Sequence, residues 1–147
     1  MQSRIKLTID SNLENVPLFA TIVNKLCSLI PLSDVESYQI EVCVVEAVNN
    51  AIKHAYLNER GHEVEVIFTL YTNKLVIDIC DVGRMMELEN KPCLDFDPND
   101  IKNLPESGMG LFIIDSIMDE LTYRIQEGKN ILTMTKCFNP NGKKSKL

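Results

Sequence analysis

Residues 41–56 read EVCVVEAVNNAIKHAY, and their apolar spacing is that of an amphipathic helix. One side of this helix is apolar and contains Ile40, Val44, Ala47, Val48, Ala51 and Ala55. The opposite side is polar and contains Glu46, Asn49, Asn50, Lys53 and His54. Asn is less favourable than Ala inside a helix by about 0.5 kcal/mol or more, so helix formation alone does not explain two in succession. The polar side therefore indicates a binding or catalytic role.

The length and charge of the chain limit its class. A chain of 147 residues is long enough for one domain with its own core, and we expect that domain to span 1–138, with 139–147 as a flexible tail. The net charge of -6 and the pI near 4.9 argue against nucleic acid or a membrane surface as the main partner, because both require a basic face. No segment resembles a signal sequence or a membrane span, so we expect a cytoplasmic location.

The cysteines and histidines exclude one kind of site. The five cysteines are Cys27, Cys43, Cys80, Cys93 and Cys137. Their odd number and the lack of CxxC spacing indicate reduced thiols in an intracellular protein. Two histidines without a Cys pair do not make an ordinary zinc site, whereas an oxygen-bound Mg²⁺ remains compatible with the sequence.

The segments before this helix are a predicted strand followed by a predicted helix. Polar and apolar residues alternate over 4–10, which predicts a strand. A helix over about 16–30 follows and is stopped by the next proline. Ser33 or Asp34 then caps the long helix, which we expect to continue to about Tyr56.

The segments after it complete an α+β pattern. They are strands over 63–70 and 75–80, a helix over 111–118, and strands over 121–126 and 130–137. This order predicts a two-layer sandwich in which helices cover one face of a mostly antiparallel, mixed sheet. Between Gly83 and Ser107, roughly 24 residues lack periodicity, and a loop of that length in a compact domain is usually a functional lid or disordered.

Three short segments carry residues suited to chemistry, and the first is the polar side of the long helix. Glu46 and Asn50 are one helical turn apart, so their side chains project to neighbouring points. A carboxylate there can accept a proton, and an Asn amide oxygen can bind Mg²⁺ beside water and phosphate oxygens. A solvated helix face would give the same pattern, so this pair alone does not decide between the two.

The second segment is Asp81-Val82-Gly83, at the end of a predicted strand. A carboxylate in that position can accept a hydrogen bond from an exocyclic amine such as that of adenine, and so distinguish ATP from GTP. Asp and Gly are also ordinary residues of a turn that ends a strand. The third segment runs from Ser107 to Leu111, a glycine-rich entry to a helix whose free N–H groups suit phosphate oxygens, and it is not a Walker A loop.

Together these segments resemble the three conserved boxes of the GHKL ATPase superfamily, which includes gyrase B, MutL, heat-shock chaperone ATPases and histidine kinases. The resemblance is closest to the small anti-sigma factor kinases of the RsbW and SpoIIAB type, and it covers nearly the whole chain. It implies a Bergerat-type sandwich with a mobile ATP lid. It also implies that Glu46 is the general base, that Asn50 binds Mg²⁺ and that Asp81 accepts from adenine. The other nucleotide-binding residues that it implies are His54, Gly83, Ser107, Gly108, Met109, Gly110 and Leu111.

The resemblance further implies an activity. In this family Mg²⁺ and ATP support transfer of the γ-phosphate to a serine of an anti-anti-sigma protein of the STAS type, and the kinase sequesters a sigma factor. The family also forms homodimers. We therefore expect a protein serine kinase with these two protein partners, in which Glu46 orients and deprotonates the serine hydroxyl.

Two alternatives remain open. Met85 stands where the family usually has a second glycine, Glu106 precedes the glycine loop where a cation is common, and Asn130 stands near a position often occupied by Thr. These departures indicate a nucleotide-gated binding module of the same fold that does not transfer phosphate. A detached histidine kinase catalytic domain is the third reading, and a histidine substrate on a separate protein would support it.

Overall fold

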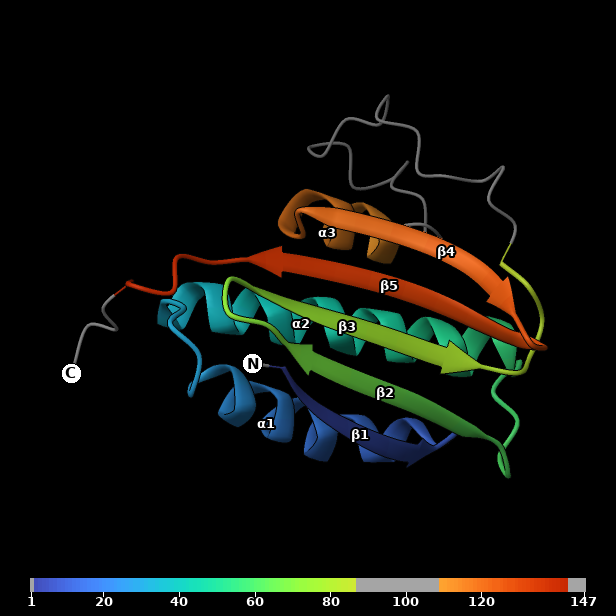
Figure 1. Ribbon diagram of the computed structural model, residues 1–147. Helices are drawn as coiled ribbons and strands as arrows, with labels where there is room; N and C mark the ends of the chain where they lie inside the picture. The colour runs from blue at the N-terminus through green and yellow to red at the C-terminus, as the bar shows by residue number, and fades with distance from the viewer. Residues whose placement is uncertain (1, 87–108, 143–147) are drawn as a thin grey trace, which may run out of the picture.

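The computed structural model describes residues 2–86 and 109–142, which form five strands, three α-helices and two short helical segments (Figure 1). The strands are β1 (Ser3–Asp10), β2 (Glu63–Leu70), β3 (Lys74–Asp81), β4 (Glu120–Gln126) and β5 (Lys129–Cys137). The helices are α1 (Val16–Cys27), α2 (Asp34–Asn50) and α3 (Met109–Ile117), with a 3-10 turn at Leu13–Asn15 and a π-helical turn at Ala51–Ala55. The predicted lid falls almost wholly on residues 87–108, and part of the predicted tail on 143–147; both ranges lie outside the described residues.

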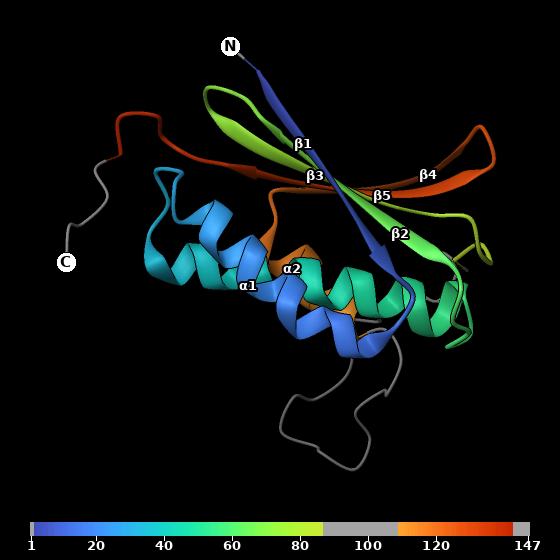
Figure 2. The same cartoon turned by 90° about the horizontal axis from the view of Figure 1, so that it is seen from below.

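The strands form one sheet in the order β1-β2-β3-β5-β4. Every neighbouring pair among these described strands is antiparallel, so the mixed character expected from the sequence is not seen in this part of the chain. Figure 2 shows the helices on one face of the sheet, which makes a two-layer arrangement. The α+β fold class predicted from the order of elements is confirmed. Polar and apolar residues alternate along the strands, so only one face of the sheet is buried.

The register of the sheet places one apolar row under the helices. It consists of Leu7, Val66, Ile79, Leu132 and Tyr123, one residue from each strand. Val66 is fully buried and Ile79 almost so, and burying such a side chain contributes about 1.5–3 kcal/mol. Since side chains alternate across a strand, the next helix-facing position on β3 after Ile79 is Asp81.

Helix α2 begins where the sequence predicts a cap. The Ser33 hydroxyl accepts from the Glu36 N–H (3.1 Å) and the Glu36 carboxylate accepts from the Ser33 N–H (2.8 Å), which is a complete capping box for α2. The first helix ends earlier than expected, at Cys27 rather than near Ile30, because turn-type hydrogen bonds replace the helical ones in the residues that follow.

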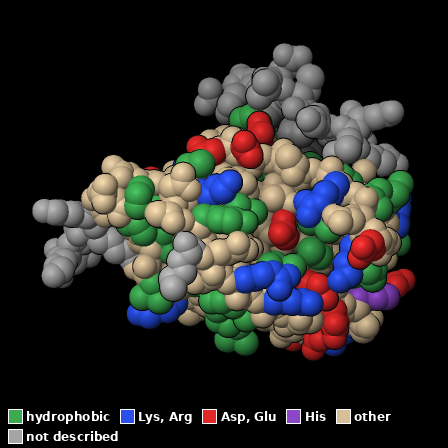
Figure 3. All heavy atoms as spheres, viewed as in Figure 1, with side chains coloured by type: hydrophobic (Ala, Val, Ile, Leu, Met, Phe, Trp, Pro, Cys, Tyr) green, Lys and Arg blue, Asp and Glu red, His purple; other side chains and the backbone are tan. Residues whose placement is uncertain are grey.

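The face of the sheet away from the helices is polar. Figure 3 shows Lys and Arg side chains interspersed with Asp and Glu over this face. Glu65 accepts from Lys6 (3.2 Å) and Lys129 (3.3 Å), and so links β1, β2 and β5. In the described ranges, no helix combines the length and apolarity needed to span a bilayer.

Candidate functional site

The polar side of α2 is covered by the first turn of α3. A methyl group built on Gly110 would lie 3.0 Å from Glu46 Oε2 and 3.0 Å from Asn50 Nδ2. Glu46 and Asn50 are accordingly half-buried, so the simple reading of a solvated helix face does not describe them. The close approach of the α3 backbone is possible because residue 110 has no side chain.

Helix α3 is fixed at its other end by β5. The Lys136 Nζ donates to the carbonyl oxygen of Ile117 (3.1 Å), in the last turn of α3, where a cation is favourable to the helix dipole. Ile114 anchors the middle of the helix, since it is completely buried. The positive end of α3 lies beside the Glu46 carboxylate at Gly110, and the N-terminus of a helix is a favourable place for an anion.

The long helix changes to a π-turn directly after Asn50. The Tyr56 N–H donates to the Ala51 carbonyl (3.0 Å), five residues back, and Leu57 (φ 53°) and Asn58 (φ 60°) then end the helix in left-handed conformations. The sequence predicted a continuous α-helix to about Tyr56, so the extent is confirmed but the geometry of the last turn differs. π-Turns inside helices occur frequently at functional sites.

The segment after β3 docks on this helix end. The Arg84 N–H donates to the Ala55 carbonyl (2.9 Å), and a methyl group on Gly83 would lie 2.3 Å from that same oxygen. Since a backbone oxygen cannot move aside as a side chain can, residue 83 must be glycine in this arrangement. The second predicted segment thus meets the end of the long helix at Ala55.

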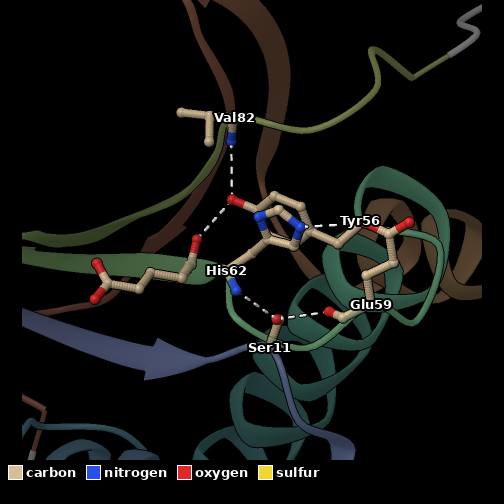
Figure 4. Close-up of polar contacts among 6 residues, drawn as sticks. Ser11, Tyr56, Glu59, His62 and Val82 are labelled. Carbon is tan, nitrogen blue, oxygen red and sulfur yellow. Dashed lines mark hydrogen bonds and ion pairs between the residues drawn. The ribbon is translucent and has the colours of Figure 1, made fainter.

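A tyrosine hydroxyl separates β2 from β3 at this point (Figure 4). The Tyr56 hydroxyl donates to the Glu63 carbonyl (2.6 Å) and accepts from the Val82 N–H (3.0 Å). The β2–β3 register ends at Glu65 and Cys80, and two further residues would pair Glu63 with Val82 through direct backbone hydrogen bonds. The hydroxyl takes the place of one of those bonds, so β2 and β3 part after Cys80.

The turn between the helix and β2 is held in place around the same tyrosine. The His62 ring stacks on Tyr56, with centroids 4.6 Å apart and planes 6° from parallel, and its Nε2 lies 3.3 Å from Glu59 Oε2. Ser11, just after β1, accepts from the His62 N–H (3.0 Å) and donates to the Glu59 carbonyl (2.8 Å), as Figure 4 shows. Together with the hydrogen bonds to Glu63 and Val82, these contacts fix the position of Tyr56 between the ends of β2 and β3.

Asp81 lies where β3 leaves the sheet. Its Oδ1 accepts from Asn130 Nδ2 (2.8 Å) and from the Gly83 N–H (3.0 Å). Burial raises the pKa of the Asp81 carboxyl, and these two hydrogen bonds offset part of that rise. Among the described residues no hydrogen bond falls on Oδ2.

The predicted site residues fall into two groups along one helix. Glu46 and Asn50 meet Gly110 near the middle, and Gly83 meets the helix end at Ala55, with Asp81 two residues before it. From residue 46 to residue 55 the helix advances about 14 Å at 1.5 Å per residue.

The other predicted residues are placed less closely. His54 is exposed on the π-turn and Leu111 is half-buried in α3. Helix α3 begins at Met109, while Ser107 and Gly108 lie outside the described residues.

Comparison with known proteins identifies the family. A profile of the histidine kinase-like ATPase domain matches residues 9–136, which include every described helix and strand apart from most of β1 and the last residue of β5. The chain belongs to the histidine kinase-like ATPase domain family. The resemblance inferred from the three segments is thereby confirmed.

Individual members of this family cover most of the chain. The serine-protein kinase RsbW of Listeria monocytogenes is 29% identical over 143 residues, which are 95% of this chain and 90% of that protein. RsbW of Bacillus thuringiensis is 28% identical over 137 residues, 90% of this chain and 84% of that protein. The solved structure of the Acinetobacter baumannii histidine kinase AdeS has a TM-score of 0.52 at 17% identity, over 90% of this chain and 68% of that one, which is a likeness of fold.

The residues of this histidine kinase-like domain fit a magnesium ion that is shared with a nucleotide. The Asn50 amide oxygen would lie 3.6 Å from a methyl group on Gly110, close to the Glu46 carboxylate, and a hard oxygen donor of this kind suits Mg²⁺. Within the described ranges, no three His, Cys, Asp or Glu side chains are grouped to hold a metal. Mg²⁺ is commonly bound by one or two protein groups together with phosphates and water, so such a set is sufficient.

Three contributors to the site were not predicted from the sequence. Asn130 binds the Asp81 carboxylate, Tyr56 parts β2 from β3, and Lys136 anchors α3. In the sequence Asn130 stands out only as a departure from the family pattern, and nothing local marks the other two. A cavity of about 310 Å³ near Tyr56 is lined by Asp81, His62 and Lys129 among others, but not by Glu46 or Asn50, so it is not where the predicted groups meet.

Proposed function

We propose that this chain is an ATP-dependent serine-protein kinase that phosphorylates an anti-anti-sigma protein of the STAS type and sequesters a sigma factor. The observation that carries the proposal is the placement of Glu46 and Asn50 against the first turn of α3 at Gly110. The two RsbW relatives bear the name serine-protein kinase and match almost end to end, which supports the same activity here.

The proposed roles follow from the chemistry of each group. Asp81 accepts from the exocyclic amine of adenine through Oδ2, and the N–H groups at the start of α3 bind phosphate oxygens. Glu46 accepts the proton of the attacking serine hydroxyl, and Asn50 offers its amide oxygen to the metal. When bound, Mg²⁺ neutralises charge on the phosphates. His54, Gly83, Ser107, Gly108, Met109 and Leu111 remain proposed members of the same nucleotide site.

The test is phosphate transfer from γ-labelled Mg-ATP to candidate STAS partners. Glu46→Gln is expected to bind Mg-ATP like wild type but to lose transfer by about 100-fold or more, the range of a general base. Asn50→Ala is expected to lose both metal-dependent binding and transfer. Glu14→Gln, at an exposed carboxylate in the 3-10 turn before α1, serves as the control and should transfer normally. Absence of phosphoserine in every candidate partner with the wild-type protein would refute the proposal.

A nucleotide-gated binding module is the second candidate. The segment entering the region of the predicted lid is tied to three elements: Arg84 to Ala55, Gly83 to Asn130, and the Met86 N–H to the Tyr123 hydroxyl of β4 (2.9 Å). A nucleotide at Asp81 would therefore act on the position of that segment without any transfer. Calorimetry that shows ATP binding, combined with sigma-factor binding that depends on ATP but no transfer, would favour this candidate.

We also propose that the chain forms a homodimer in the cytoplasm. No described strand pairs with the outer edge of β1. Ser11 and His62 form a hydrogen-bonded pair, so by alternation the N–H groups of Lys6 and Thr8 point to that free edge. Thr8→Pro removes one outward N–H, and sedimentation should then detect a weaker dimer. A wild-type monomer at all concentrations would refute this proposal.

A further inference from the structure

We propose that Asn130 is a positioning residue for nucleotide recognition: its amide holds one oxygen of the Asp81 carboxylate and so presents the other oxygen to the amine of an adenine nucleotide. This inference rests on the nucleotide site proposed above. It assigns a specific task to a residue at which this chain departs from its family.

The side-chain hydrogen bonds of Asn130 to other described residues are all made by its Nδ2. The residue is 4% exposed and faces Asp81 directly in the β3–β5 ladder. Its Nδ2 lies 2.8 Å from Asp81 Oδ1, 3.0 Å from the Gly83 carbonyl oxygen and 3.4 Å from the Arg84 carbonyl oxygen. One buried amide therefore fixes both the carboxylate and the backbone that follows it.

The orientation of this amide is determined by its surroundings. All three neighbours are acceptors, and an Asn amide carries its two donors on nitrogen. The opposite orientation would place the amide oxygen against a carboxylate and two carbonyl oxygens, which is unfavourable in a buried position. Asn130 thus acts as a donor to Asp81.

Loss of this donor changes what Asp81 can offer. Burial raises the pKa of the Asp81 carboxyl, and the bond from Asn130 is the largest effect that opposes the rise. Without it the neutral carboxyl becomes more populated and can no longer accept on both oxygens at once. With the donor present, Oδ1 is occupied by Asn130 and Gly83, and Oδ2 is directed to the ligand.

Other titratable and charged groups surround Asp81. Among the described residues they are Tyr56 at the helix end, His62 just before β2, Glu63 and Glu65 on β2, Cys80 on β3, Arg84 after β3, and Lys129 at the start of β5. All are retained in the variants used below. A difference between variants in their pH profiles therefore reports position 130.

The test compares two substitutions with opposite expected pH profiles. Affinities for Mg-ATP and Mg-GTP are measured by calorimetry between about pH 5.5 and 8.5 and expressed relative to wild type at each pH. Asn130→Leu removes the donor, so its relative ATP affinity should be lowest in acid and recover as Asp81 ionises. Asn130→Asp introduces a carboxyl that can donate only when protonated, so its relative affinity should be highest in acid. Near neutral pH the affinity of each variant for ATP should be about tenfold or more below that of wild type, and its affinity for GTP should change little.

Two further variants separate positioning from structure. Asn24 also donates its amide to a carboxylate, that of Glu41 (3.0 Å), between α1 and α2, so Asn24→Asp makes the same charge change at a distance from the site. It should leave ATP affinity unchanged at every pH. Asn130→Ser keeps a smaller donor, should retain most of the ATP affinity, and remains informative if the Leu or Asp variant does not fold.

The outcomes distinguish this inference from the proposed function. If wild-type protein does not bind Mg-ATP, the proposed function fails. If wild type binds and Asp81→Asn does not, but the Leu and Asp variants of Asn130 bind ATP as wild type does, the inference on Asn130 is wrong. It is equally wrong if both variants lose ATP and GTP alike with the same pH profile, or if Asn130→Ser loses as much ATP affinity as Asn130→Leu.

Discussion

Two glycines of the candidate site differ in what surrounds them, and this difference sets the effect of replacing each. The space next to Gly83 is filled by a backbone oxygen at 2.3 Å, whereas the space next to Gly110 is bounded by the ends of two side chains at 3.0 Å. Both positions were predicted from the sequence as part of a nucleotide site. Only the structure shows that one glycine serves the fold and the other leaves room at the site.

Gly83→Ala is expected to destabilise the protein. The added methyl group collides with the Ala55 carbonyl, so the segment that carries Arg84 must move away from the helix end. Overpacking of this kind costs about 1–3 kcal/mol, which urea unfolding would measure as a lower midpoint at unchanged slope. An unchanged midpoint would show that the two segments are not in contact.

Gly110→Ala is expected to affect function more than stability. Glu46 and Asn50 can shift by a few tenths of an ångström, and alanine favours a helix over glycine by up to about 1 kcal/mol, so the free energy of unfolding should hold or rise. The shift displaces both groups from their positions, so phosphate transfer should fall at least tenfold. Unfolding and transfer assays on the same sample check this. Gly83→Ala is the comparison, since its main effect should be a loss of stability.

At the residue scale, the sequence pointed only to groups that lie in local motifs. Glu46, Asn50 and Asp81 could be proposed as site residues because their type and spacing are chemically unusual for a helix face or a strand end. Asn130 could not be assigned a contact, because the ladder register places it opposite Asp81 from 49 positions away in the chain. A pairing of that kind becomes visible only when the sheet is known.

At the scale of elements, the π-turn and the parted strands form one unit that depends on Tyr56. Tyr56→Phe removes the hydroxyl and leaves the Val82 N–H and the Glu63 carbonyl facing one another. These two groups can then form the backbone hydrogen bond that the register favours, so stability should change by less than about 1 kcal/mol. Closing the strands moves Asp81, so ATP affinity should fall.

Hydrogen exchange provides a direct measurement for this variant. The Val82 amide should remain protected in Tyr56→Phe, since it exchanges one acceptor for another, while ATP affinity decreases. Tyr38→Phe is the matched control, because the Tyr38 side chain is exposed on α2. If ATP affinity is equal in both variants, the parting of β2 and β3 has no role in the site.

The boundaries of most elements were predictable, and the form of the last helical turn was not. Hydrophobic spacing and the capping box fix where α2 begins, and both are local in sequence. The π-turn depends on contacts with residues 82–84, which lie far along the chain, so a pattern within the helix does not reveal it.

At the scale of the whole molecule, the sheet separates two electrostatic environments. The helix-covered face holds Asp81 in a partly buried position, and the open face holds Glu65 between Lys6 and Lys129. Burial would raise the pKa of Glu65, but its two lysine partners outweigh that effect and the net pKa is lowered. The two carboxylates therefore contribute to stability with opposite signs.

The same chemical change at these two positions should have opposite effects on unfolding. The folded-state pKa of Asp81 is raised, so its favourable contribution is present in acid and is lost as the pH rises through that pKa; Asp81→Asn should therefore increase stability at pH 7. The folded-state pKa of Glu65 is lowered, so its contribution is present at neutral pH and is lost as the pH falls through that pKa. Glu65→Gln should decrease stability at pH 7 by about 0.5–1 kcal/mol and by less in high salt, because the ion pairs are partly exposed.

Urea unfolding at pH 7 and near pH 3.5 measures both effects. The difference in free energy of unfolding between each variant and the wild type should be smaller at the acid pH. If both substitutions change the free energy of unfolding in the same direction at neutral pH, the two faces of the sheet do not differ electrostatically in this way.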